Sequence, residues 1–267
     1  MPIFAYLLSF LIFSTQVIAE PTVYIYAGPG STKTCLEQAE HTLESMLKPY
    51  YRIERIYAEQ ILNDPWEKNA ALLVIAGGED IPYAKALNGI GNQKIRSYVE
   101  NGGSFLGICA GAYYAGDFVE FAKGTELEVL GERELAFFPG TVRGPNLAPY
   151  VYRSERGALA AHILWKDALK FPQDTPFTVY YNGGGYFVDA ESKNNVHVLA
   201  TYDTPDRPAA IVECEIGSGK AILSSVHFEF DPALFDPKDP YLEAIKAEMS
   251  ENQNRLNLVQ HLLERLL

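Results

Sequence analysis

The chain has 267 residues, of which 48% are hydrophobic, enough for the packed core of one large α/β domain or two small ones. Its net charge is −12, from 34 acidic and 22 basic side chains. That balance argues against nucleic acid or an anionic membrane as a partner, and we interpret the charge as an ordinary solvated surface.

Residues 1–19 form an uncharged, largely apolar segment at the start of the chain. Its apolar run, residues 3–13, is too short for a comfortable membrane span, and residues 17–19 resemble a cleavage site. We therefore predict a signal peptide over residues 1–19, a single domain over residues 20–267, and a periplasmic or secreted protein that leaves the membrane after cleavage. Because no Lys or Arg precedes the apolar run, an uncleaved N-terminal anchor stays open as the alternative.

The first half of the domain alternates strands, glycine-rich loops and helices. The loop at residues 28–32 lacks the lysine–serine ending of a phosphate-binding loop and the glycine spacing of a dinucleotide site, so we expect no cofactor. No Cys and His cluster has zinc-ligand spacing, so we expect no metal. Periodicity and turn residues predict strands at residues 22–27, 51–57, 71–76 and 104–108, and helices at residues 33–47 and 92–100.

Cys109 lies at the junction between the predicted strand at residues 104–108 and a run of small and aromatic residues that predicts a helix. Gly107 and Gly111 stand two residues before and after it, as a sharp strand-to-helix turn requires. Such a turn lifts the sulfur clear of the sheet and directs helix N–H groups toward it, an arrangement typical of a nucleophile. On this short pattern alone, a buried structural cysteine is an equally good interpretation.

The order of these elements predicts an α/β fold with a mostly parallel central sheet and helices on both faces. In such sheets, ligands bind at the carboxyl ends of the strands. The loops at residues 28–31 and 77–80, and Cys109, each follow a strand directly. We therefore expect all three to face one common cleft that binds a small-molecule substrate.

The second half of the chain has shorter, more interrupted patterns. Residues 124–176 contain several Gly and Pro residues and predict loops and short strands that cover the fold rather than a second core. Asn182 precedes three glycines, which indicate either a tight turn or a place where its amide meets a ligand. Further patterns predict strands at residues 177–181, 196–202, 209–216 and 220–226, the last two as a hairpin, and a helix at residues 254–267.

His227 and Glu229 lie two residues apart at the end of the last predicted strand. Residues at i and i+2 of an extended segment share a face, so the carboxylate can hold the imidazole. A nucleophilic thiol needs such a pair, because the imidazole takes its proton and the carboxylate orients the ring. Alone, this pattern is more typical of a solvated surface pair, and its weight comes from its combination with Cys109.

The other two cysteines, Cys35 and Cys214, leave two arrangements open. In an exported chain they would pair and leave Cys109 as the free thiol. Alternatively, each is a single buried cysteine, and this is the interpretation we favour.

Four motifs in order carry a resemblance to a known family: residues 77–83 (GGEDIPY), 87–92 (LNGIGN), 107–114 (GICAGAYY) and 181–185 (YNGGG). With the cysteine turn and the H-x-E ending, the chain resembles the class I glutamine amidotransferase-like superfamily. Within it, the chain is most similar to the N-terminal domain of eukaryotic biotin–protein ligases and its free-standing bacterial relatives. The resemblance spans residues 23–231 and implies a single domain of flavodoxin-like architecture.

The resemblance also implies roles for matching residues. Cys109 is expected to be the nucleophile, His227 the general base and acid, and Glu229 the carboxylate that orients the imidazole. The expected donors of an oxyanion hole are the backbone N–H groups of Gly77, Gly78 and Ala110. The expected substrate-binding residues are Glu79, Asp80, Asn182, Gly183 and Gly184, with Glu79 and Asp80 either contacting a substrate amine or serving as plain polar loop residues.

Together these features predict an exported cysteine hydrolase that acts on a small amide or amino-acid-like substrate through a thioester. Phe228 stands where glutamine amidotransferases have proline, and no ammonia-using domain follows. The motif that activates biotin is absent, so biotinylation is not carried over. Two alternatives stay open: a non-catalytic small-molecule-binding module of the same fold, and a redox role in which Cys109 is oxidised. The oligomeric state is not predicted.

Overall fold

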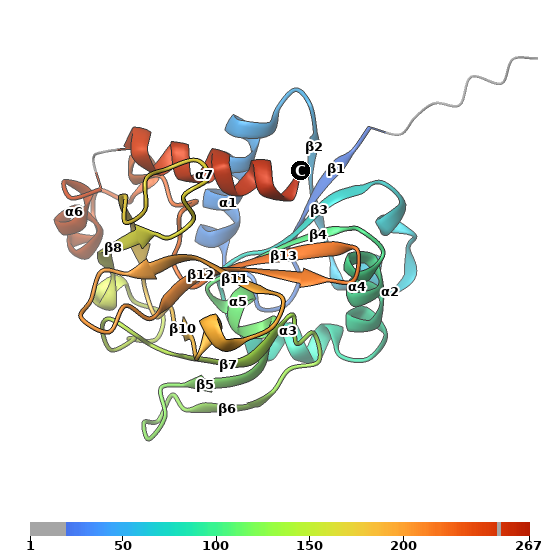
Figure 1. Cartoon of the computed structure of the whole chain (residues 1–267), viewed down its shortest axis with the longest axis horizontal. Helices are drawn as coiled ribbons and strands as arrows, with labels where there is room; N and C mark the ends of the chain where they lie inside the picture. Colours follow the sequence, from blue (N-terminus) through green and yellow to red (C-terminus); the bar gives the residue numbers. More distant parts are fainter. Residues whose placement is uncertain (1–19, 250–251) are drawn as a thin grey trace, which may run out of the picture.

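The computed structural model of the chain describes residues 20–249 and 252–267. In these residues, thirteen strands form one mixed sheet in the order β2-β1-β3-β4-β13-β12-β10-β7-β5-β6, and β11, β8 and β9 extend from β12 (Figure 1). The predicted signal peptide lies outside the described residues, so the location inferred from it stays a prediction. The strands are β1 (Thr22–Tyr26), β2 (Arg52–Ile56), β3 (Ala70–Ile75), β4 (Ser104–Ile108), β5 (Gly116–Phe121), β6 (Val129–Glu132), β7 (Phe138–Gly144), β8 (Leu159–Trp165), β9 (Pro176–Tyr181), β10 (Tyr186–Phe187), β11 (Val196–Tyr202), β12 (Ala209–Ile216) and β13 (Gly219–Ser224).

Helices cover both faces of the parallel part of this sheet. Along β3, Leu72 and Val74 pack with α1 and α7, whereas Leu73 and Ile75 pack with α2, α3 and α4. Figure 1 shows α1 and α7 above the strands and α3 below them. Alternation along the strand therefore buries both faces, as expected for a parallel strand with helices on each side. The helices are α1 (Lys33–Leu47), α2 (Ala58–Asn63), α3 (Asp80–Leu87), α4 (Ile90–Glu100), α5 (Ala110–Tyr114), α6 (Pro240–Lys246) and α7 (Asn252–Leu266).

The prediction of a mostly parallel sheet is wrong. The strands β2, β1, β3, β4 and β13 do pair in parallel, but β12 pairs antiparallel with both β13 and β11. The sheet continues as a mixture of antiparallel and parallel pairs through β10, β7, β5 and β6. The α/β class with helices on both faces is confirmed, whereas the finer flavodoxin-like description is not shown. The physical reason is that hairpins extend the sheet beyond β13 and add strands without crossover helices.

Residues 124–176 contain short strands and add no second core, as predicted, but these strands are part of the main sheet and do not merely cover it. Residues 138–144 form β7, which pairs with β5 and β10, and residues 159–165 form β8, which pairs with β11 and β9. Their buried side chains, such as Val142 and Ile163, belong to the two main cores. Short strands of this kind are stabilised by partners far away in the sequence, which a local pattern does not reveal.

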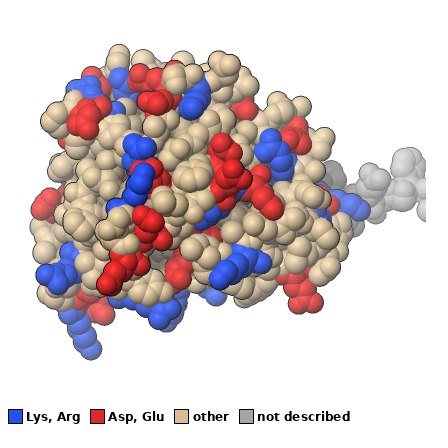
Figure 2. Space-filling model, turned by 90° about the horizontal axis from the view of Figure 1, so that it is seen from below, with Lys and Arg blue, Asp and Glu red and all other residues tan. Residues whose placement is uncertain are grey.

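Two further findings concern the cysteines and the surface. Cys35 and Cys214 are free thiols, so the disulfide alternative is not realised, and Cys214 is buried in β12 as expected of a single cysteine. On the face in Figure 2, basic side chains lie among acidic ones, so the net charge of −12 is not gathered into one acidic patch there. No helix within the described ranges is long and apolar enough to cross a membrane.

Candidate functional site

A cleft of about 600 Å³ opens at the carboxyl ends of β1, β3 and β4. The loops after β1 and β3 and the turn at Cys109 all line it, so the predicted common cleft is confirmed. Of the predicted site residues, the lining includes Cys109, Ala110, His227, Gly78, Glu79, Asp80, Asn182 and Gly183. Gly77, Gly184 and Glu229 lie behind this surface; Glu229 is 2% exposed.

Cys109 sits on a strained turn between β4 and α5. Its backbone has φ +51° and ψ −106°, which a non-glycine residue adopts only at a cost of roughly 1–3 kcal/mol. Its N–H donates to the Ser224 carbonyl at 2.7 Å, which fixes the turn against β13. Gly111 makes the turn possible, because a Cβ there would lie 1.9 Å from the Ile75 carbonyl oxygen. The predicted strand-to-helix turn is therefore present, with its glycine requirement explained by the contact with β3.

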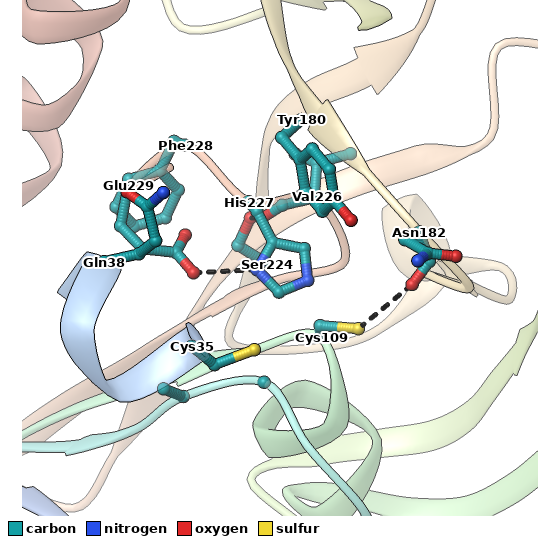
Figure 3. Close-up of polar contacts among 12 residues, drawn as sticks. Cys35, Gln38, Cys109, Tyr180, Asn182, Ser224, Val226, His227, Phe228 and Glu229 are labelled. Carbon is teal, nitrogen blue, oxygen red and sulfur yellow. Dashed lines mark hydrogen bonds and ion pairs between the residues drawn. The ribbon is translucent and has the colours of Figure 1, made fainter. Parts of the chain in front are cut away.

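His227 and Glu229 form a buried pair beside this turn (Figure 3). Nδ1 of His227 lies 2.7 Å from Oε1 of Glu229, and the two residues are 3% and 2% exposed. Burial by itself lowers the pKa of the His227 imidazole, but the negative charge of Glu229 and the neighbouring Cys109 outweigh it and hold that pKa well above its usual value. The ring nitrogen not bonded to Glu229 faces Cys109 (Figure 3). Cys109, His227 and Glu229, which the sequence predicted to meet, therefore lie close to one another.

The Cys109 thiol points toward the Asn182 carbonyl, 3.9 Å away. Asn182 keeps its place through its side-chain amide, which donates to the Ser154 carbonyl and to Glu155, each at 3.1 Å. The glycines after it allow close approach of the chain to β13, because a Cβ at Gly184 would lie 1.8 Å from the Ser225 carbonyl oxygen. Asn182 thus contributes its backbone carbonyl to the thiol and uses its amide to fix the loop.

Cys35 is a second thiol in the cleft, which the sequence did not place there. It lines the cleft from the first turn of α1, where its N–H donates to the Thr32 side chain at 3.4 Å. A Cβ at Gly77 would lie 2.8 Å from the Cys35 sulfur and 2.6 Å from a carbon of the His227 ring, so the three meet at one point. Burial raises the pKa of the Cys35 thiol to about 11, so this thiol is neutral at physiological pH.

The two acidic residues predicted to contact a substrate amine already have protein partners. Asp80 accepts two bonds from the Arg133 guanidinium, at 3.0 and 2.6 Å. Glu79 accepts from the Tyr152 hydroxyl at 3.0 Å, and the Arg153 guanidinium lies 3.9 Å away. Tyr152 and Arg153 belong to the segment between β7 and β8. Glu79 therefore joins that segment to the loop after β3, and all three residues line the cleft.

The far end of the cleft is apolar, and sequence reasoning did not identify it. It is formed by β5, β6 and the segment that joins them, together with Tyr113 and Tyr150. Phe121 contacts both tyrosine rings edge-on, with ring centroids 5.5 and 5.7 Å apart. The apolar side chains lining this end include Val119, Phe121, Leu127 and Val129. The only local signal was the apolar alternation of β5, which becomes informative once β7 is known to pair with it.

Within the described residues, no group of three or more His, Cys, Asp or Glu side chains is arranged to hold a metal ion.

The cleft combines a polar end at Cys109 and His227 with an apolar end at β5 and β6. This arrangement suits a small amphiphilic molecule, because apolar walls supply affinity and a few placed polar groups fix orientation.

Comparison with known proteins identifies the family. The family model described as biotin-protein ligase, N terminal, matches residues 21–267. The chain belongs to the biotin–protein ligase N-terminal family. A biotin–protein ligase of Schizosaccharomyces pombe is 35% identical over 247 residues, which is 91% of this chain and 37% of that protein. The chain thus spans little more than a third of the length of that relative.

One further sequence relative and one solved structure of similar fold match this family member over most of their length. An uncharacterized protein of Chlamydia muridarum is 33% identical over 250 residues, covering 92% of this chain and 95% of that protein. The solved structure of a ThuA-like protein from Bacteroides uniformis is similar in fold, with a TM-score of 0.50, 13% identity and coverage of 86% of this chain and 90% of that one.

These comparisons correct the predicted function. The expected exported cysteine hydrolase with a cysteine nucleophile and catalytic triad is contradicted, because the matching family and the relative are named for biotin–protein ligase and not for a hydrolase. The reason lies in the limits of geometry: a thiol beside an imidazole occurs in sites of many kinds and does not by itself define a reaction. The residues of the cleft remain the place to look for function.

Proposed function

We propose that this biotin–protein ligase N-terminal family member has a biotin-related role, in which its cleft binds biotin or a biotin conjugate. The observation that carries the proposal is the family match over residues 21–267 together with a cleft that is polar at one end and apolar at the other. Biotin carries polar ureido and carboxyl groups at its two ends and an apolar ring and chain between them, so its carboxyl end and its apolar middle match the two parts of this cleft. The relative named as a biotin–protein ligase supports the same ligand class.

The proposed orientation places the carboxyl end of biotin at His227. The raised pKa of the His227 imidazole favours its cationic form, which attracts a carboxylate. Cys109 and His227, two of the site residues predicted from the sequence, then form the polar wall of a binding site, and Glu229 holds the His227 ring from behind that wall. The aliphatic chain and ring of biotin lie along Phe121 and Leu127 at the other end.

We also propose that the fold belongs to the class I glutamine amidotransferase-like superfamily. The strained cysteine turn after β4 and the buried His227–Glu229 pair support this grouping. The predicted extent of the domain, residues 20–267, stays a prediction; the family model matches residues 21–267. The grouping concerns architecture and adds no reaction to the proposal.

Titration calorimetry with biotin, biotinamide and valerate tests the proposal. We expect biotin to bind and valerate to bind far more weakly, since valerate lacks the ring system. Biotin affinity should fall as pH rises through the raised pKa of His227, whereas biotinamide affinity should change little because it has no carboxylate. Absence of binding by both biotin and biotinamide at millimolar concentration would refute the biotin-related role.

A matched pair of variants tests the location of the ligand. Leu127 lines the cleft, whereas Leu130 lies on the same β-hairpin, is 45% exposed and does not line it. Leu127→Gln should weaken biotin binding about tenfold through loss of apolar contact, and Leu130→Gln should leave it unchanged. Equal effects of the two substitutions would place the ligand elsewhere.

A further inference from the structure

Arg255 is a fully buried cation that lies outside the cleft, on α7. Its side chain is 1% exposed and belongs to a helix far along the chain from the cysteine turn. Burial lowers the pKa of its guanidinium, and the charges of Asp231 and Glu229 oppose that effect. Burying a guanidinium costs desolvation free energy unless hydrogen bonds and opposite charges compensate it, and an apolar side chain would fill the space at less cost. The contacts of Arg255 show which part of the protein it holds in place.

The guanidinium contacts a residue on each side of Glu229, the backbone of Phe228 and the side chain of Asp231. Its Nη1 donates to the Phe228 carbonyl at 2.9 Å, and its Nη2 lies 3.3 Å from Oδ2 of Asp231. Its Nε donates to the Asn252 side chain at 2.7 Å, which fixes the guanidinium plane from the start of α7. Glu229, which bonds His227, lies between Phe228 and Asp231 in the sequence.

Helix α1 holds the same segment from another side. The Thr42 hydroxyl donates to the Glu229 carbonyl at 2.6 Å, and Gln38 accepts from the Asp231 N–H at 2.7 Å. No strand pairing supports residues 228–231, since β13 ends at Ser224 and an isolated bridge to Tyr180 ends at His227. The segment that carries the Glu229 carboxylate therefore depends on side chains from two helices for its shape.

We infer that Arg255 is a positioning residue of the cleft. By binding the Phe228 carbonyl and the Asp231 carboxylate, it fixes the Glu229 carboxylate against Nδ1 of His227 and so sets the orientation of the imidazole. Arg255 itself touches no ligand. The inference does not depend on biotin being the ligand, because it concerns the geometry of the buried pair. It gives α7, at the C-terminal end of the chain, a direct part in the site.

The test compares two arginines of the same helix. Arg265 also pairs with carboxylates, with its Nε 2.8 Å from Glu213, but those partners belong to β12 and to the segment after β8 rather than to the cleft. The readout is the downfield proton NMR signal of the Nδ1–H that His227 donates to Glu229, assigned by its loss in His227→Gln. We expect Arg255→Met to shift or abolish this signal and Arg265→Met to leave it in place, although both variants lose stability.

Arg255→Lys provides a second variant that retains the cation. Because a lysine ammonium cannot grip two acceptors with the fixed fork of a guanidinium, we expect a smaller displacement of the same signal than in Arg255→Met. If Arg255→Met does not fold, a displaced signal in Arg255→Lys with an unchanged one in Arg265→Lys supports the inference. An unchanged His227 signal in folded Arg255→Met, or in Arg255→Lys where Arg255→Met does not fold, overturns it and leaves Arg255 a purely structural residue.

Discussion

The protein buries two histidines in two different regions, and they respond to burial in opposite ways. His227 lies at the cleft with the Glu229 carboxylate 2.7 Å from its ring. His261, on α7, lies between Trp165 and Phe171, with ring centroids 5.2 and 5.5 Å away. The pKa of the His227 imidazole is raised well above its usual value, whereas burial, and then Arg265 and Lys170, lower the pKa of the His261 imidazole.

In these two histidines the charged groups next to the ring, and not burial, decide whether the buried imidazole carries charge. Neither ring nitrogen of His261 has a hydrogen-bond partner among the described residues; the nearest carboxylates are Glu264, 3.8 Å away, and Asp167. The two sites therefore have opposite effects on stability against pH. His227 stabilises the fold below the ordinary histidine pKa, and this contribution is lost as pH rises through its raised value. His261 destabilises it as pH falls below the ordinary value, because only the unfolded state then binds the proton readily.

Removing the negative charge of Glu229 should lower the free energy of unfolding more than any other change proposed below. Glu229→Gln keeps the shape of the side chain but removes the charge that holds the His227 proton. We expect the free energy of unfolding at neutral pH to fall by about 2–3 kcal/mol, and the pKa of His227 to move down. Urea denaturation and an NMR titration of His227 measure the two changes.

A surface pair of the same type is the control. His197 lies 3.3 Å from Glu215, and both side chains are more than half exposed. Glu215→Gln should change the free energy of unfolding by less than about 0.5 kcal/mol, because water screens the pair. If Glu229→Gln were as mild as Glu215→Gln, the contrast between paired and unpaired burial would not hold.

Loosening the segment that carries Glu229 should have an intermediate effect. Thr42→Val removes the buried hydroxyl that donates to the Glu229 carbonyl at 2.6 Å while keeping the side-chain volume. We expect a loss of about 1–1.5 kcal/mol, measured by urea denaturation, because a buried acceptor loses its donor. Thr178→Val, at a half-buried position of β9, serves as the comparison, and a loss no larger than in that variant would show that α1 does not support the segment.

Replacing His261, whose ring nitrogens have no hydrogen-bond partner among the described residues, should change the free energy of unfolding least and with the opposite sign. His261→Phe puts an apolar ring between Trp165 and Phe171 and removes two unpartnered ring nitrogens. We expect the protein to gain about 1 kcal/mol at acidic pH and less at neutral pH, since the penalty for protonating His261 disappears. Thermal unfolding at a series of pH values checks this.

The control for that series is a histidine on the surface. His162 is exposed on β8, where its ring contacts Thr178 at 3.1 Å. The pH profile of stability of His162→Phe is the reference for the loss of an exposed histidine. A profile for His261→Phe that runs parallel to this reference would mean that the buried ring does not couple to pH.

The sequence by itself determined the features that depend on a few neighbouring residues. The turn at Cys109 follows from the glycines around it, since only they allow the tight approach to β3. The meeting of His227 and Glu229 follows from their spacing on an extended segment. Eight strands and the helices α1, α4 and α7 were found in the same way, because periodicity and turn residues are local properties.

The tertiary structure alone decided what those residues meet. Three features arise from contacts between distant segments: the mixed part of the sheet beyond β13, the apolar end of the cleft at β5 and β6, and the place of Arg255 behind Glu229. The raised pKa of His227 and the lowered pKa of His261 also depend on such contacts, because each results from a balance between burial and the charges nearby. A short window of sequence records neither long-range pairing nor burial, and for that reason it predicted where the site lies but not what surrounds it.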